Sequence, residues 1–447
     1  MKPMSLRRAI VLCVLAVIVV AGAGVAWVML PPGALSFAGG NPVALADYQG
    51  PTPTGVPTEL RTADLVKRGE YLTKAADCEI CHTTEGGQPF AGGRAFKTPF
   101  GTLYSPNITA DKPTGIGDWS DADFIRAVHQ GIGKDGSHLY PAFPYESYTR
   151  LTDDDVRAIK AHLFSLPAVH APTPANALAF PFNQRWLMAV WSAFYNPDQR
   201  FQPREDRSPD WNRGAYLVEA LGHCGDCHTP RNLAQALDNR RKFAGTVTQG
   251  WRAYNITADQ ESGIGAWSDD ELATYLATGH AAGHGSAGGP MAEVVDVSLA
   301  MLSPADIRAI VTYLRSIPAI STPDLPPPKA VPVSDMPKTM ATGFDPRGKQ
   351  VFEGACAGCH GWTGVSLLTS EATLTGSRSV NDSTGTNVAQ IVISGERRQT
   401  PHGVVMMPAF GHAYSDIEIA AVANYVTARF GARASSLTAK AVAELRP

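Results

Sequence analysis

The sequence has few cysteines, and it has no run of basic residues beyond its N-terminus. Its 447 residues carry a formal net charge of −3 and seven cysteines. Proteins that bind nucleic acid present clustered lysine and arginine, so this charge balance excludes nucleic acid as a predicted partner. The chain also has no nucleophile elbow of the hydrolase type. At roughly 100–200 residues per domain, its length allows about three domains.

Most of the few cysteines belong to one repeated pattern, Cys-x-x-Cys-His. Its three copies are Cys78, Cys81 and His82; Cys224, Cys227 and His228; and Cys356, Cys359 and His360. This pattern attaches haem c through two thioether bonds. The seventh cysteine, Cys13, lies in the apolar N-terminal segment, so no pair remains for a structural disulfide. The sequence therefore predicts three covalently bound haem c groups.

Two other uses of paired cysteines fit less well. A zinc site needs further Cys or His ligands at a suitable spacing, and no second pair accompanies any of the three motifs. A redox dithiol does not require a histidine directly after the second cysteine, and it would not predict three copies.

The N-terminus begins with positive charges followed by an apolar run. Lys2, Arg7 and Arg8 precede Ala9 to Leu30, which contains no charged side chain. As a helix these residues would span roughly 33 Å, enough to cross a bilayer. We therefore expect residues 1–30 to be a membrane anchor in contact with lipid, single-pass in the cytoplasmic (inner) membrane, with the haem domains in the periplasm. A cleaved signal peptide is the alternative.

The rest of the chain shows a domain-sized repeat. Each haem motif ends a short helical pattern, in which Gly69, Gly214 and Gly348 hold matching places. Each repeat closes with an amphipathic helix that follows a Ser or Thr N-cap, at Thr152, Ser303 and Ser415. We predict an all-α fold, with one N-terminal transmembrane helix followed by three cytochrome c-like domains. The predicted ranges are the anchor at 1–30, a Pro/Gly linker at 31–60, domain 1 at 61–170, a joint at 171–208, domain 2 at 209–318, a Pro-rich linker at 319–344, and domain 3 with a C-terminal tail at 345–447.

The joint is rich in aromatic side chains, which are Phe180, Phe182, Trp186, Trp191, Phe194 and Tyr195. We interpret them as packing between domains 1 and 2. A docking or membrane-surface patch is the alternative.

The histidine of each motif, His82, His228 or His360, is placed to bind iron from one side. A methionine commonly fills the sixth position in cytochromes c and raises the potential. In domain 3 we predict Met407, with Met406 as the neighbouring alternative. In domain 2 we predict Met291, and we interpret Met301 as a core residue.

Domain 1 departs from this pattern. Phe143 stands where a methionine is expected, and no methionine occurs between His82 and Leu151. His138, in the same loop as Phe143, is our predicted sixth ligand of the iron in domain 1. An open or water-bound iron, or a ligand from elsewhere such as Met188, remains an alternative.

Several short sequence motifs carry a family resemblance. They are Ser105-Pro106-Asn107-Ile108-Thr109, the Tyr-Pro-Ala-x-Pro-Tyr loop at 140–145, Phe180-Pro181-Phe182-Asn183, Gly222-His223-Cys224, and Met407-Pro408-Ala409-Phe410-Gly411. Over nearly the whole length past residue 60 the chain resembles the membrane-bound tri-haem cytochrome c subunits of bacterial periplasmic dehydrogenases.

The resemblance implies an electron-transfer subunit beside a separate catalytic subunit. Electrons would pass through the haems to ubiquinone or to a terminal oxidase. Phe143 makes the chain more similar to the members that accompany molybdenum enzymes, so we expect a molybdopterin aldehyde dehydrogenase, with or without a small iron–sulfur subunit. A quinoprotein alcohol dehydrogenase or a flavin sugar dehydrogenase comes next. The alternative function is a peroxidase-like haem enzyme that uses a five-coordinate first haem, with His138 or His129 as its acid–base group.

Overall fold

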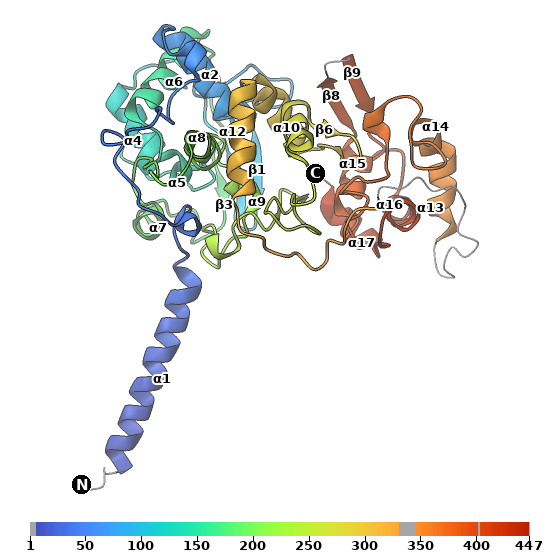
Figure 1. Cartoon of the computed structure of the whole chain (residues 1–447), viewed down its shortest axis with the longest axis horizontal. Helices are drawn as coiled ribbons and strands as arrows, with labels where there is room; N and C mark the ends of the chain where they lie inside the picture. The colour runs from blue at the N-terminus through green and yellow to red at the C-terminus, as the bar shows by residue number, and fades with distance from the viewer. Residues whose placement is uncertain (1–5, 330–344, 401–402, 447) are drawn as a thin grey trace.

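A computed structural model describes residues 6–329, 345–400 and 403–446. Its first helix, α1 (Leu6–Met29), projects away from the rest of the molecule, as Figure 1 shows. Among the described residues, no helix combines the length and the apolar character needed to cross a membrane. This finding overturns the prediction of an N-terminal transmembrane helix.

The prediction of an all-α fold is also wrong, because short strands pair between the helices. One sheet has the order β1-β2-β3, and β4-β5, β6-β7 and β8-β9 form two-stranded sheets. Tight turns close hairpins at glycines with positive φ, such as Gly250 (76°) between β4 and β5 and Gly283 (81°) between β6 and β7. Strands of two to five residues are too short to show a clear alternation of polar and apolar residues. The strands are β1 (Ala95–Thr98), β2 (Gly101–Tyr104), β3 (Ala177–Leu178), β4 (Thr246–Thr248), β5 (Trp251–Ala253), β6 (His280–Ala281), β7 (Gly285–Ser286), β8 (Glu396–Thr400) and β9 (Gly403–Met407).

Helices form the rest of the framework, and the names domain 1, 2 and 3 are kept for residues 61–170, 209–318 and 345–447. Domain 1 holds α2 (Leu65–Ala75), α3 (Cys78–His82), α4 (Asp121–Gln130), α5 (Tyr145–Tyr148) and α6 (Asp153–Ser165). The joint holds α7 (Leu187–Tyr195). Domain 2 holds α8 (Pro209–Tyr216), α9 (Gly225–His228), α10 (Asp269–Thr278), α11 (Pro290–Val297) and α12 (Pro304–Arg315). Domain 3 holds α13 (Pro346–Val351), α14 (Ala357–His360), α15 (Thr386–Ser394), α16 (Asp416–Phe430) and α17 (Ala439–Leu445).

One helix pair recurs in each domain: α2 packs on α6, α8 on α12, and α13 on α16. Figure 1 shows the three pairs in succession, with α2/α6 at one end and α13/α16 at the other. The repeated glycines explain the close crossing. A Cβ on Gly69, Gly214 or Gly348 would collide with a backbone carbonyl of the facing helix. Only a residue without a side chain fits at these three points.

The predicted N-caps of the closing helices are confirmed. The hydroxyls of Thr152, Ser303 and Ser415 accept hydrogen bonds from the backbone N–H three residues on. Each bond satisfies an N–H that the first turn leaves without a partner.

Domains 1 and 2 are related by a pseudo-two-fold arrangement. The hydroxyl of Tyr71 on α2 donates to Asp306 Oδ2 on α12 (2.6 Å), and the hydroxyl of Tyr216 on α8 donates to Asp155 Oδ2 on α6. These residues hold equivalent places in the two repeats. A single hydrophobic core runs through both domains, whereas domain 3 has a core of its own. Domains 1 and 2 therefore form one packed unit.

The segments between domains differ from one another. Residues 31–60 lie against the body, where Arg204 donates to the carbonyl of Leu35 (2.9 Å). In the joint, Phe180, Trp186 and Phe194 are 79%, 64% and 64% exposed, so the interpretation as interdomain packing is wrong for these three. It is confirmed for Trp191, whose ring packs edge-on against Tyr145 of domain 1 and whose Nε1 donates to the carbonyl of Ala234 in domain 2 (2.8 Å). Residues 330–344 of the predicted Pro-rich linker lie outside the described residues.

Candidate haem-binding sites

Each predicted attachment motif lies in a short helical segment. Cys78, Cys81 and His82 belong to α3, and the motifs of domains 2 and 3 end α9 and α14. In domains 2 and 3 a short π-helical turn, Leu217–Leu221 or Phe352–Cys356, leads into the motif. The helical turn places the two thiols and the imidazole of a motif on neighbouring positions.

The three motif histidines share one hydrogen-bonding arrangement. Nδ1 of His82, His228 and His360 lies 2.7 Å from the backbone carbonyl oxygen of Pro106, Tyr254 and Ala372, respectively. Because a carbonyl can only accept, Nδ1 carries the proton and Nε2 keeps its lone pair. Burial lowers the pKa of all three imidazoles, which favours the neutral form. This is the arrangement that orients a histidine for binding iron through Nε2.

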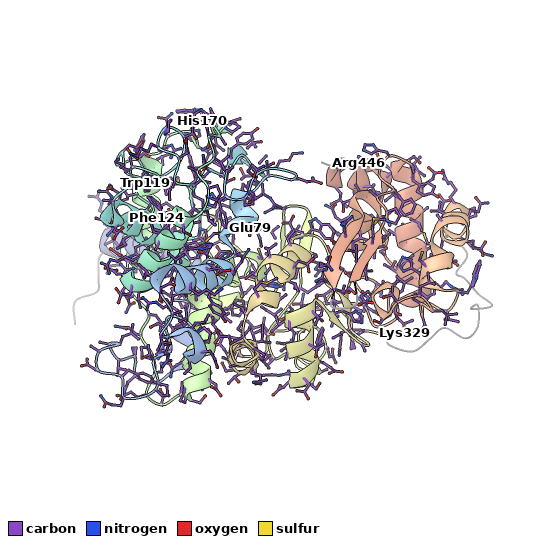
Figure 2. The ribbon with its side chains drawn as sticks, turned by 90° about the horizontal axis from the view of Figure 1, so that it is seen from above. Glu79, Trp119, Phe124, His170, Lys329 and Arg446 are labelled. Carbon is purple, nitrogen blue, oxygen red and sulfur yellow. The ribbon has the colours of Figure 1, made fainter. Side chains whose placement is uncertain are left out.

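A cavity of about 850 Å³ adjoins the motif of domain 1. Cys78, Cys81 and His82 lie on its wall, and most of the remaining lining is apolar. Trp119 and Phe124 also line it, and Figure 2 labels both in the lobe that contains α4. A large apolar cavity beside paired thiols and an oriented imidazole fits a haem group.

The thiols themselves do not fit a redox dithiol. Burial raises the pKa of Cys78 and Cys224 to about 12, whereas a reactive dithiol needs a lowered thiol pKa. Within the described ranges, no group of three or more His, Cys, Asp or Glu side chains could hold a metal ion by itself. The motifs therefore suit haem, whose porphyrin supplies four of the iron ligands.

Phe143 and Met291 occupy equivalent places after equivalent hairpins. Leu139 N–H donates to Gly131 O, and Ala287 N–H donates to Gly279 O, both at 2.7 Å. Phe143 follows the first of these bonds by four residues, and Met291 follows the second by four. Phe143 lines the domain 1 cavity, and its ring has no atom that can bind iron.

His138 lies one residue before Leu139, at the place that Ser286 holds in domain 2. It is not among the cavity-lining residues, although Ser137 and Leu139 are. Its Nδ1 is buried and has no hydrogen-bond partner in the described part of the chain. His138 as an iron ligand remains a prediction.

The two predicted methionine ligands lie at the edges of their domain cores. Met291 is the second residue of α11, and Met407 is the last residue of β9. Both are partly buried against core residues. The neighbouring Met406 is 62% exposed, and Met301 is 54% exposed, so the interpretation of Met301 as a core residue is wrong. Met291 and Met407 remain predictions as iron ligands.

Two residues that the sequence did not single out as functional lie at the domain 1 site. His223 of domain 2 lines the cavity around His82, and its Nε2 lies 3.0 Å from Asp77 Oδ1. Each of the two residues directly precedes the first cysteine of a motif. That shared position, together with the place of His223 in the Gly222-His223-Cys224 motif, is a signal in the sequence that could have indicated them.

Comparison with known proteins gives two family-model matches. The model "Cytochrome c" matches residues 66–167, and the model "Cytochrome C oxidase, cbb3-type, subunit III" matches residues 345–426. These ranges contain the first and the third haem motifs.

Longer similarities extend over most of the chain. One of the subunits of nicotinate dehydrogenase from Pseudomonas putida is 42% identical over 383 residues, which are 85% of this chain but 31% of that protein. The gluconate 2-dehydrogenase cytochrome c subunit of Pantoea cypripedii is 40% identical, over 86% of this chain and 89% of that protein. The fructose dehydrogenase cytochrome subunit of Gluconobacter japonicus is 38% identical, over 85% of this chain and 82% of that protein. The chain therefore belongs to the family of cytochrome c subunits of dehydrogenases, haem proteins that transfer electrons.

Proposed function

We propose that this protein is the tri-haem electron-transfer subunit of a periplasmic dehydrogenase complex. Haem c, when bound, supplies an iron that accepts and releases one electron at a time. The observation that carries the proposal is the same 2.7 Å contact from Nδ1 to a backbone carbonyl in all three motif histidines. Because the third motif shares it, we assign a haem to domain 3 as well as to domains 1 and 2.

We assign the sixth ligand of each haem iron to a residue of this chain. We assign Met291 to the domain 2 haem and Met407 to the domain 3 haem, because both lie beside the cores and come before the closing helices. For domain 1 we assign His138, whose buried Nδ1 lacks a hydrogen-bond partner among the described residues. A His/His haem has a lower potential than a His/Met haem, so the first haem would be the low-potential member.

The electron donor would be a separate catalytic subunit. Relatives named for nicotinate, gluconate and fructose dehydrogenases support a dehydrogenase as the partner. We favour a molybdopterin aldehyde dehydrogenase, with or without an iron–sulfur subunit, because of Phe143. A quinoprotein alcohol dehydrogenase and a flavin sugar dehydrogenase are the next candidates. The acceptor would be ubiquinone or a terminal oxidase, and the haem domains would work on the periplasmic side of the cytoplasmic membrane.

Copurification tests this proposal most directly. We expect an affinity-tagged chain to bring down a catalytic subunit, and we expect the substrate of that subunit to reduce the haems of the complex in a visible spectrum. The chain purified alone should bind haem but should oxidise none of the candidate substrates. Substrate oxidation by the isolated chain would contradict an electron-transfer role.

A peroxidase-like role is the second candidate, because Phe143 leaves the cavity around His82 without a methionine ligand. Such a role needs an acid–base group beside the iron. His138, as the assigned iron ligand, would not be free for this role. His129 is not among the cavity-lining residues, and burial lowers its pKa to about 4. Peroxide-dependent oxidation of a dye, lost on removal of either histidine, would support this role over electron transfer.

A further inference from the structure

Asp77 and His223 meet across the interface between domains 1 and 2. His223 Nε2 donates to Asp77 Oδ1 at 3.0 Å, and the side chains of His223 and Asp77 are 14% and 8% exposed. Asp77 directly precedes Cys78, and His223 directly precedes Cys224. A buried, paired charge thus joins the two chain segments that would carry the first and the second haem.

Both residues adopt a backbone conformation that side chains rarely take. The φ angles of Asp77 and His223 are 43° and 33°, in the left-handed region. Such conformations persist where the surrounding structure holds them, and they cluster at functional sites. Tyr148 contributes to that surrounding structure. Its ring packs edge-on against His223 at 5.4 Å, and its hydroxyl donates to the carbonyl of Ala76 at 2.7 Å.

The position of the pair is set by the pseudo-two-fold arrangement. Asp77 and His223 hold equivalent places in two duplicated domains, so a contact between them lies on the axis that also relates Tyr71–Asp306 to Tyr216–Asp155. The two motifs therefore approach each other across this axis. His223 of domain 2 lines the same cavity as Cys81 of domain 1.

The bridge is charged at neutral pH. Burial opposes a charge on His223, but Asp77, and after it Asp226, outweigh that effect and raise the pKa of His223 to about 9. Asp226 Oδ2 lies 3.7 Å from the other ring nitrogen of His223. Hydrogen bonds between charged groups are shorter and stronger than neutral ones, and a low-dielectric interior strengthens them further.

We propose that Asp77 and His223 form a bridge that fixes the spacing of, and carries the electronic coupling between, the haem groups bound at Cys78/Cys81 and at Cys224/Cys227. This inference rests on the proposed function in one respect, that both motifs hold haem. The two residues are positioning residues, because neither binds iron. The bridge makes domains 1 and 2 a coupled haem pair, to which domain 3 is attached through separate contacts such as Arg252–Asp382.

The full haem-loaded chain and its His223→Gln variant test the bridge. Haem content is measured first. A photochemical reductant then delivers one electron, and its redistribution between the first two haems is followed spectroscopically. We expect the variant to slow this exchange measurably, because losing one charge-assisted hydrogen bond loosens the spacing of the two motifs and weakens the coupling between the groups that they hold. We also expect a redox titration to give lower midpoint potentials, because the uncompensated Asp77 carboxylate favours the ferric state. Asp77→Asn provides the same rate test if His223→Gln binds less haem.

Tyr71→Phe is the matched control, because it removes an interdomain hydrogen bond that does not adjoin a motif. The proposal predicts an unchanged exchange rate in this control. An unchanged rate in fully haem-loaded His223→Gln, or an equal slowing in Tyr71→Phe, would overturn the bridge. Since the photochemical reductant replaces the dehydrogenase, the absence of a dehydrogenase partner would refute the proposed function without affecting this result.

Discussion

Phe143 holds in domain 1 the place that Met291 holds in domain 2. The two hairpins share the hydrogen bonds that close them, from Leu139 to Gly131 and from Ala287 to Gly279, and the two side chains follow at the same distance along the chain. One duplicated scaffold thus presents a thioether in one copy and an aromatic ring in the other. The two copies differ at this place in the type of side chain, so single substitutions can test how that side chain affects the haem.

Phe143→Met should give the first haem a methionine within reach. Because methionine raises the potential relative to a second imidazole, we expect the lowest midpoint potential of the protein to rise. A redox titration followed in the visible spectrum measures this. Phe143→Leu is the control for the change in packing. Equal midpoint potentials in the two variants would show that position 143 does not face the iron.

His138→Ala should convert one of the three haems from low spin to high spin. The imidazole is our assigned sixth ligand there, and alanine offers no replacement. Electron paramagnetic resonance or magnetic circular dichroism of the oxidised protein detects the change. His170, whose side chain is 64% exposed, supplies the control His170→Ala. An unchanged set of low-spin signals in His138→Ala would rule out this ligand.

Met407→Leu should lower the midpoint potential of the domain 3 haem, because leucine keeps the apolar volume and removes the thioether. The expected fall is a sizeable part of the range of about 0.8 V over which ligands and surroundings tune haem. Met406→Leu is the matched control, since that side chain is 62% exposed. A larger fall in midpoint potential in Met406→Leu than in Met407→Leu would show that Met406, and not Met407, is the iron ligand.

The attachment motifs could be proposed from the sequence because the haem-binding chemistry of this family is local in the chain. Two cysteines and a histidine within five residues carry their own geometry, and the N-caps at Thr152, Ser303 and Ser415 depend only on the residues that follow them. Hairpins of two to five residues per strand were missed, since so few residues give no usable periodicity.

Contacts between repeats could not be predicted from one chain alone. Asp155 and Asp306 look like ordinary acidic residues in the first turn of a helix, yet each accepts a hydrogen bond from a tyrosine of the other domain. The sequence contains the donors, Tyr71 and Tyr216, as well as the two aspartate acceptors. Only the packing of domain 1 on domain 2 shows that they cross over, and the same holds for Asp77 and His223.

Lys242→Met should destabilise the protein by about 3–5 kcal/mol, the cost of leaving one member of a buried ion pair without its partner. Lys242 Nζ lies 2.8 Å from Glu219 Oε2, and both side chains are 5% exposed. The hydroxyl of Tyr313 also donates to Glu219. Denaturant unfolding of the haem-loaded protein measures the loss. Lys67→Met removes a pair with side chains 56% and 46% exposed and should leave stability unchanged. Equal stabilities of the two variants would contradict a structural role for the buried pair.

Glu146→Gln should remove a pH dependence of stability that the native protein shows. Burial, and then the charge of Asp226, raise the pKa of Glu146 above its ordinary 4.5, against the opposing charges of Arg231 and Arg150. Its Oε1 has no hydrogen-bond partner among the described residues. Above pH 4.5 the unfolded chain has lost this proton while the folded chain keeps it, so stability falls as pH rises towards the folded-state pKa.

Glutamine is neutral at every pH, so Glu146→Gln should match the native protein near pH 4 and be more stable at pH 8. The expected difference is roughly 1.4 kcal/mol for each unit by which the fold raises the pKa. Thermal unfolding across this pH range measures it, with the exposed Glu59→Gln as the control. If Glu146→Gln and the native protein lost stability in parallel between pH 4 and pH 8, another group would be responsible. A gain confined to high pH would identify Glu146 as a buried acid whose ionisation loosens the contact between domains 1 and 2, where Arg231 and Asp226 face it.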